Sequence, residues 1–198
     1  GEILGSRPAR LIALHLGSGA SACAMRDGTS IATSMGLTAL DGLPMATRCG
    51  DLDPGVVLHL VQDRGMSPDD VADLLYRQSG LLGVSGISSD PRVLLESSAP
   101  EAREALDLYC YRIASQAGSL MVDLGGIDAV VFSGGVGENS PEIRTRIIEH
   151  LEWLGPRIEQ TANLANSTLL SPPDAPVSVI RIEADEERII ARDCASLL

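Results

Sequence analysis

The sequence predicts an α/β domain in which helices cover both faces of one mixed β-sheet. Short apolar segments end at glycine-rich turns, as buried strands do. The first three segments follow one another closely, whereas the last two are separated by a helical stretch. Antiparallel strands are therefore expected first, followed by a parallel strand–helix–strand unit. A long amphipathic segment in the middle of the chain would pack on the sheet as a helix.

The first three strands are predicted at residues 10–16, 21–25 and 30–33. The first is a nearly continuous apolar run that stops at Gly17-Ser18-Gly19. Asp27-Gly28 joins the other two, because this dipeptide accommodates the positive φ angles of a hairpin turn. The three strands together predict an antiparallel meander.

Helices are predicted at residues 54–64, 67–78 and about 100–124. The second begins at Ser67, where a hydroxyl N-cap is followed by a proline and two acidic residues, as at many helix starts. Residues 80–92 are rich in glycine and serine, so an irregular segment is expected there. One face of the longest helix carries an apolar stripe, formed by Ala102, Ala105, Leu106, Tyr109, Ile113, Ala117, Leu120 and Leu124.

The C-terminal third alternates strands and helices. In chain order we expect a strand at 128–132, a tight loop at 133–137, a helix from its cap at 139–142 to Trp153, a strand at 177–182 and a helix at 185–198. With the meander, these give a mixed five-stranded sheet with helices on both faces. This order is that of one half of the actin, Hsp70 and sugar-kinase superfamily (ribonuclease H-like), in which two such domains close over ATP. The helices at about 54–98 are expected to be an insertion.

The composition excludes several partners and several kinds of chemistry. The 198 residues include 27 acidic and 15 basic side chains, for a net charge of −12. This charge argues against a nucleic acid or an anionic membrane as partner, because both require a basic surface. All 15 basic residues are arginine. The absence of lysine excludes Walker-A ATPases, protein kinases with a catalytic lysine and Schiff-base enzymes.

The chain carries no segment typical of membrane insertion or secretion. No apolar run approaches the roughly 20 residues that span a bilayer, and the N-terminus lacks the basic start of a signal peptide. The four cysteines form no CxxC pair, which predicts a reduced, cytoplasmic protein without structural zinc. Because the first residue is not Met, we expect a fragment of a longer protein.

Two glycine-rich loops are candidate phosphate-binding sites. Residues 15–21 connect two strands, and glycines there would let backbone N–H groups approach an anion. Residues 132–139 lead from a strand end to a helix start, where ligands bind in open α/β sheets. A Rossmann motif is excluded, because Ser140 replaces its third glycine and Glu152 falls inside a helix. For both loops the alternative is a turn with a purely structural role.

Arg48 is a candidate phosphate-binding cation. It lies in a loop at residues 47–54, in which Asp51 and Asp53 would hold it towards a phosphate. The alternative is an exposed ion-pair network, which is the usual role of such residues.

A series of motifs occurs in a characteristic order. In sequence they are His15-Leu16-Gly17-x-Gly19, Thr33-Ser34-Met35-Gly36, Gly42-Leu43, the segment Thr47 to Pro54, Ser79-Gly80-Leu81-Leu82-Gly83, the segment Phe132 to Asn139, and Ile190-Ala191-Arg192-Asp193. Together they resemble the second, nucleotide-binding half of the acetate (and propionate) kinase family over roughly residues 9 to 196. The resemblance implies reversible phosphate transfer from ATP to acetate, with Mg²⁺, in a homodimer.

The resemblance also implies a role for each matching residue. The loop that holds the β- and γ-phosphates would be His15, Leu16, Gly17, Ser18 and Gly19. The adenosine moiety would contact Asp90, Pro91, Arg92, Gly135, Val136, Gly137, Glu138 and Asn139. Arg48 would be catalytic, stabilising charge on the transferred phosphoryl group, and Glu186 would help to bind Mg²⁺. An arginine fork suits phosphate oxygens and a carboxylate suits Mg²⁺.

Three residues depart from the family pattern. Ser18 stands where the family usually has Asn, Pro91 where it commonly has Phe, and Ala39 where it has a Pro that lines the acyl pocket. Ala39 keeps a longer acid, such as propionate or butyrate, as an alternative substrate. The family's N-terminal half carries a catalytic Asp and most of the acetate pocket, so this chain alone is expected to be inactive. A non-catalytic nucleotide-binding or dimerisation module is the other alternative.

Overall fold

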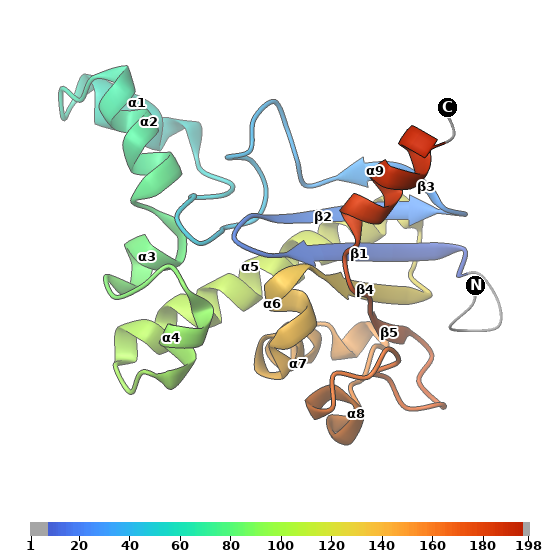
Figure 1. The fold of residues 1–198 in the computed structure, drawn as a ribbon. Helices are drawn as coiled ribbons and strands as arrows, with labels where there is room; N and C mark the ends of the chain where they lie inside the picture. Colours follow the sequence, from blue (N-terminus) through green and yellow to red (C-terminus); the bar gives the residue numbers. More distant parts are fainter. Residues whose placement is uncertain (1–7, 196–198) are drawn as a thin grey trace.

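The sheet is mixed and five-stranded in the computed structural model, which describes residues 8–195 apart from the side chains of Glu186, Ile189 and Asp193. The strands lie in the order β3-β2-β1-β4-β5 (Figure 1). They are β1 (Arg10–Leu16), β2 (Ala20–Arg26), β3 (Thr29–Thr33), β4 (Ala129–Ser133) and β5 (Ser178–Arg181). β1 to β3 pair antiparallel, whereas β4 pairs parallel with both β1 and β5. The predicted sheet is confirmed.

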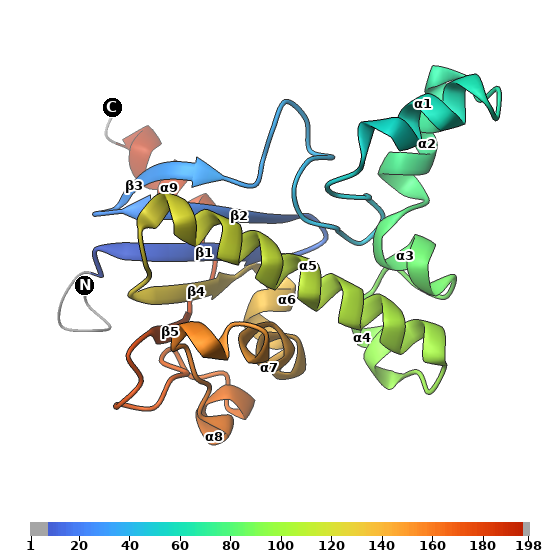
Figure 2. The same cartoon turned by 180° about the vertical axis from the view of Figure 1, so that it is seen from behind.

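One long helix forms the core with the sheet. α5 (Pro100–Leu124) crosses one face (Figure 2), and every residue of its predicted apolar stripe is buried. Ile12, Leu14 and Leu16 of β1 are fully buried. α7 (Pro141–Glu149) packs beside α5, and α9 (Glu186–Ala195) lies on the other side of the sheet (Figures 1 and 2). Helices therefore lie on both sides, as predicted.

Four helices gather beyond the end of the sheet, between β3 and α5 in the chain (Figure 1). They are α1 (Pro54–Gln62), α2 (Pro68–Arg77), α3 (Gly80–Ser85) and α4 (Pro91–Glu96). The first two match the prediction, and Ser67 caps α2 by accepting a hydrogen bond from the Asp70 N–H at 3.1 Å. The expectation of an irregular segment at 80–92 is wrong for residues 80–85 and 91–92, which are helical, and right for residues 86–90. Gly86 ends α3 in a left-handed conformation, and the Asp90 carboxylate caps α4.

The tight loop predicted at 133–137 is also wrong, because a short helix, α6 (Gly134–Asn139), begins directly after β4. The carboxylate of Glu138 accepts a hydrogen bond from the Gly134 N–H at 2.8 Å and satisfies a free donor at the helix start. The next helix, α7, ends at Glu149 rather than at Trp153. Trp153 lies in a 3₁₀ turn, η1 (Glu152–Leu154), where the chain tightens before Gly155.

The last part of the chain adds one unexpected element. α8 (Gln160–Leu164) was not predicted, and its first N–H groups donate to the Glu159 carboxylate. The strand predicted at 177–182 is β5. Within the described residues the final helix is α9, and residues 196–198 of the prediction lie outside them.

The carboxyl ends of β1 and β4 meet at one edge of the sheet because the two strands are parallel. Gly134, the residue after β4, has a φ of +78°. A Cβ atom at this position would lie 2.7 Å from the carbonyl oxygen of Leu16 at the end of β1. Only glycine lets the backbone pass so close, and the loop after β1 and helix α6 are therefore neighbours.

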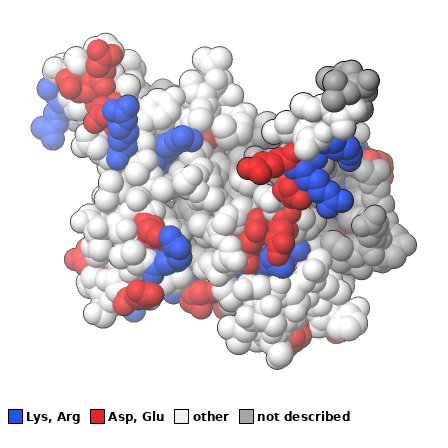
Figure 3. Space-filling model, viewed as in Figure 1, with Lys and Arg blue, Asp and Glu red and all other residues white. Residues whose placement is uncertain are grey.

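On the face drawn in Figure 3, basic and acidic side chains are interspersed, and no broad basic area is seen among the residues it describes. None of the helices between residues 8 and 195 is both long enough and apolar enough to cross a membrane.

Candidate functional site

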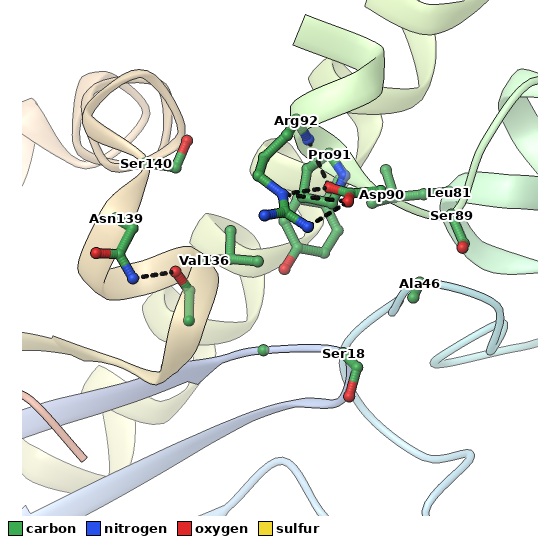
Figure 4. Close-up of a pocket in the computed structure, with 13 residues that line it drawn as sticks. Ser18, Ala46, Leu81, Ser89, Asp90, Pro91, Arg92, Val136, Asn139 and Ser140 are labelled. Atoms are coloured by element: carbon green, nitrogen blue, oxygen red, sulfur yellow. Dashed lines mark hydrogen bonds and ion pairs between the residues drawn. The ribbon is translucent and has the colours of Figure 1, made fainter.

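A cavity of about 580 Å³ opens at the edge of the sheet where β1 and β4 end (Figure 4). This volume lies within the range typical of small-molecule sites. The cavity is lined by Gly17, Ser18, Ala46, Leu81, Ser89, Asp90, Pro91, Arg92, Tyr109, Gly135, Val136, Asn139 and Ser140.

Three segments that are distant in sequence form its walls. Residues 17–18 come from the loop after β1 and residues 90–92 from the start of α4, while Gly135, Val136 and Asn139 come from α6. Figure 4 shows Val136 and Asn139 on one side of the cavity and the start of α4 on the other. The structure thus brings together the three segments that the sequence singled out.

The α6 wall is formed by Gly135, Val136 and Asn139. A Cβ atom on Gly135 would meet no atom within 4 Å, so this residue faces open space. Asn139 donates from its side-chain amide to the Gly135 carbonyl at 3.0 Å. Gly137 does not line the cavity, because it is buried and a Cβ there would lie 3.6 Å from the Cβ of Phe132. Gly135 of α6 therefore leaves room for the cavity, whereas Gly137 allows α6 to pack closely on Phe132.

The α4 wall is built around an ion pair. The guanidinium of Arg92 donates to the Asp90 carboxylate, with an Nη2–Oδ2 distance of 2.6 Å. The same carboxylate accepts from the Arg92 N–H at 2.9 Å, and both contacts lower the pKa of Asp90. Figure 4 shows the Arg92 side chain folded back onto Asp90. The ion pair fixes the start of α4 beside Pro91, which lines the cavity.

A second hollow of about 310 Å³ lies on the other side of the glycine loop. It is lined by His15, Gly17, Ser18, Gly19, Ala20, Ser21, Met35, Met45 and Arg48. Because Gly17 and Ser18 also line the large cavity, a ligand that crosses this loop would contact both spaces. Leu16, which was predicted as part of the loop, has its side chain fully buried in the core. It can contribute only its main chain.

Arg48 reaches this second hollow without a carboxylate partner among the described residues. One of its guanidinium nitrogens lies 3.5 Å from the sulfur of Met45. The predicted support from acidic neighbours is wrong. Asp51 accepts from the Gly42 N–H, and Asp53 caps α1.

The backbone, rather than acidic side chains, holds the Arg48 loop. The Met45 N–H donates to the Arg48 carbonyl at 3.1 Å, and the Leu81 N–H donates to the Met45 carbonyl at 3.0 Å. Gly80, with a φ of +61°, packs so tightly that a Cβ there would overlap the Met45 carbonyl oxygen. This support leaves the charge of Arg48 available to a ligand.

A third hollow, of about 490 Å³, collects acidic groups. It is lined by His15, Gly134, Gly135, Glu138, Ala184, Asp185 and Glu187. Glu138 links two segments that line this hollow. One of its carboxylate oxygens accepts a hydrogen bond from the Gly134 N–H at 2.8 Å and another from the Ala184 N–H at 2.9 Å. His15 is fixed beside it, with its Nδ1 atom 3.1 Å from the Ser133 hydroxyl.

Asp185 and Glu187 are the described carboxylates that fit Mg²⁺, which binds through one or two carboxylates together with phosphate oxygens. The predicted ligand, Glu186, lies between them in α9, but its side chain falls outside the described residues. No three His, Cys, Asp or Glu side chains of the described part form a metal-binding group by themselves.

Several residues of the cavity were missed from sequence. Leu81 and Ser89 lie in the segment expected to be irregular, and Ala46 lies in the loop before Arg48. Tyr109 was assigned only to the core stripe, yet it also lines the cavity, and burial raises the pKa of its phenol.

Arg144 was missed as well. It shares one face of α7 with Ile143, Ile147 and Ile148, and all four are buried. In the sequence, the only signal for a buried arginine here is its position on the apolar face of the predicted helix.

Comparison with known proteins identifies the fold and then the family. The fold is that of one domain of the actin, Hsp70 and sugar-kinase superfamily, as in the acetate and propionate kinases of known structure. The sequence profile of the Acetokinase family matches residues 2–192, and the chain belongs to that family.

Named relatives support this assignment. Acetate kinase from Methylocella silvestris is 51% identical over 189 residues, and acetate kinase from Rhodopseudomonas palustris is 54% identical over 185 residues. These alignments cover 96% and 92% of this chain but 47% and 46% of the relatives. The chain therefore spans about half the length of the curated relatives that it matches.

Solved structures give the same result. The crystal structure of Porphyromonas gingivalis acetate kinase superposes with a TM-score of 0.93 at 36% identity, covering 98% of this chain and 51% of the other. A propionate kinase from Francisella tularensis gives a TM-score of 0.90 at 37% identity, covering 96% and 50%.

Glu138 is the residue on which the junction between α6 and the segment before α9 depends. Changing Glu138 to Ala should lower the free energy of unfolding by about 1–3 kcal/mol, because two backbone donors lose their acceptor. Denaturant unfolding measures this change. Glu142→Ala is the matched control, since its carboxylate is 54% exposed and pairs with Arg146; it should change stability by about 1 kcal/mol or less. Equal losses of stability in the two variants would contradict this structural role of Glu138.

Proposed function

We propose that this chain is the nucleotide-binding half of an ATP-dependent kinase that transfers phosphate reversibly to acetate or another short carboxylic acid. One observation carries the proposal: residues 17–18 and 90–92, together with Gly135, Val136 and Asn139, line a single cavity of about 580 Å³. Membership of the Acetokinase family and the names of its relatives support this activity. The chain by itself is proposed to be inactive, since it corresponds to about half of each relative.

We place the adenosine moiety between α4 and α6, against Pro91 and Val136. The phosphates would then follow Gly17 to Gly19 towards Arg48, because this loop lines both the cavity and the second hollow. Phosphoryl transfer requires mainly positioning and charge stabilisation from the protein. Mg²⁺ would bind in the third hollow, where the carboxylates of Asp185 and Glu187 lie, with Glu186 as the ligand implied by family resemblance.

A bulky side chain at Gly135 should abolish nucleotide binding. In Gly135→Val the new side chain would project into the space assigned to adenosine, without a clash in the folded protein at its Cβ. Calorimetric titration of the chain with ATP and Mg²⁺ measures the loss. Gly118→Val, in α5, is the control, because Gly118 also has free space around it but does not line the cavity. Equal affinities of the Gly135 variant and the unaltered chain would remove α6 from the nucleotide site.

Arg48 is proposed to act on the transition state. In a full-length protein that contains this chain, Arg48→Ala should reduce kcat by about 10³ or more with a much smaller change in KM for ATP. A hydroxamate assay for acetyl phosphate measures both, with the isolated 198-residue chain as the inactive baseline. Arg112→Ala is the matched control, because Arg112 pairs with Asp51 at 3.7 Å and does not line a hollow next to the glycine loop. Near-normal kcat in Arg48→Ala would make Arg48 a structural residue only.

We further propose that the protein is a homodimer that uses α1 as part of its interface. None of the residues of α1 is buried, although Val56, Leu58 and Val61 are apolar and exposed by 39%, 55% and 37%. The helix projects away from the sheet (Figure 2). The Leu58→Asp variant should sediment as a monomer where the unaltered protein sediments as a dimer, because a carboxylate in an apolar contact is unfavourable. Val84→Asp, on the separate helix α3, is the control; a dimer in both variants would exclude α1.

The proposed cellular location is the cytoplasm, where ATP is available. Cys23, Cys49, Cys110 and Cys194 are all free thiols, as expected in a reducing compartment.

A further inference from the structure

Arg144 is fully buried, yet it has no carboxylate partner among the described residues. Its guanidinium makes five hydrogen bonds to neutral oxygens. Two go to the carbonyls of Gly137 and Glu138 at 2.9 Å, at the end of α6. The other three go to Asn163 and Asn166, at the end of α8, with distances between 2.7 and 2.8 Å.

These acceptors explain how the buried charge is tolerated. The last carbonyls of a helix have no partner within the helix and carry partial negative charge, so a cation at that position is stabilised. Desolvation nevertheless lowers the pKa of Arg144 to about 10, and the nearby positive charge of Arg181 acts in the same direction. Burying a charge without a carboxylate partner costs more free energy than burying an apolar side chain. This cost points to a role of Arg144 beyond packing.

The position of α6 supplies that role. α6 has six residues, too few to be stable as an isolated helix. Its outer side lines the cavity through Gly135, Val136 and Asn139, while its carbonyl end rests on the Arg144 guanidinium. Movement of α6 would therefore change the width of the cavity.

We propose that Arg144 is a positioning residue of the nucleotide site, which holds α6 against α8 in the pose that binds adenosine. The inference rests on the proposed function. Arg144 is shielded from the cavity by α6 and would act without touching the ligand. Its planar fork presents five donors on three nitrogens to the two helix ends, whereas a lysine has only three donors on one nitrogen.

The test uses two variants of different severity. Arg144→Lys keeps the charge but loses the fork. Asn166→Gly removes only one acceptor, and because Asn166 has a φ of +51°, glycine keeps its backbone conformation. Arg146→Lys is the control on the same helix, since Arg146 pairs with Glu142 and Asp107 and makes no hydrogen bond to α6.

Two measurements are made at a temperature where circular dichroism shows each variant to be folded. If α6 holds its binding pose about one tenth of the time in Arg144→Lys, Kd for ATP with Mg²⁺ rises about tenfold. A rise of about threefold is expected for Asn166→Gly and none for Arg146→Lys. Hydrogen exchange at residues 135–139 should accelerate in the first two variants only.

The outcomes separate the two proposals. Unchanged ATP affinity and unchanged α6 exchange in the folded variants would overturn the role of Arg144. Should Arg144→Lys fail to fold, the same two measurements on Asn166→Gly decide. If the unaltered chain binds no ATP, the proposed function fails, and the exchange of α6 still shows whether Arg144 holds the helix.

Discussion

The contact between Gly134 and the end of β1 is the constraint on which the rest of the site depends. A Cβ at Gly134 would approach the Leu16 carbonyl oxygen to 2.7 Å, so the residue that follows β4 has to be glycine. Because β1 and β4 are parallel neighbours, both of their following segments emerge at the same edge. One follows a tight turn back into β2 and the other starts α6, and the cavity lies between them and α4.

α6 is fixed from both ends by side chains of opposite charge. At its start, the Glu138 carboxylate binds the Gly134 N–H; at its end, the Arg144 guanidinium binds the last carbonyls. This arrangement matches the direction of the helix dipole, which favours an acid at the N-terminus and a base at the C-terminus. Glu138 also accepts a hydrogen bond from the Ala184 N–H, which links the segment before α9 to α6. Glu138 therefore connects the cavity wall with the acidic hollow.

The sequence predicted the elements whose signals are local and strong. Apolar runs that stop at glycine located the strands, and an apolar stripe located α5. It failed where tertiary contacts override propensity: α3 and α6 are glycine-rich helices that a propensity argument assigns to loops. Asp90-Pro91, at the start of α4, is a typical N-cap followed by a proline, and this local signal predicts a helix start.

The hydrogen-bond partners of individual side chains could not be predicted from the sequence. The acids nearest to Arg48 in sequence bind elsewhere, and nothing in the order of residues indicates that Arg144 meets Asn163, 19 positions away.

The pairing of arginines with carboxylates divides the arginines of this acidic chain into two groups. With 27 carboxylates for 15 arginines, an arginine that becomes partly buried is expected to find an acid. Arg10, Arg112, Arg146 and Arg181 do so, each within 3.7 Å of a carboxylate oxygen. Arg48 and Arg144 have no such partner within residues 8–195, for opposite reasons. The guanidinium of Arg144 is already satisfied by main-chain carbonyls of α6 and α8 and by the side-chain amide oxygens of Asn163 and Asn166. Arg48 instead faces a hollow beside the glycine loop with only a thioether at 3.5 Å. An acidic neighbour would neutralise Arg48 before a phosphate arrived. Its isolation from the surrounding acids supports the proposed role of Arg48 as a fixed cation that contacts a phosphate.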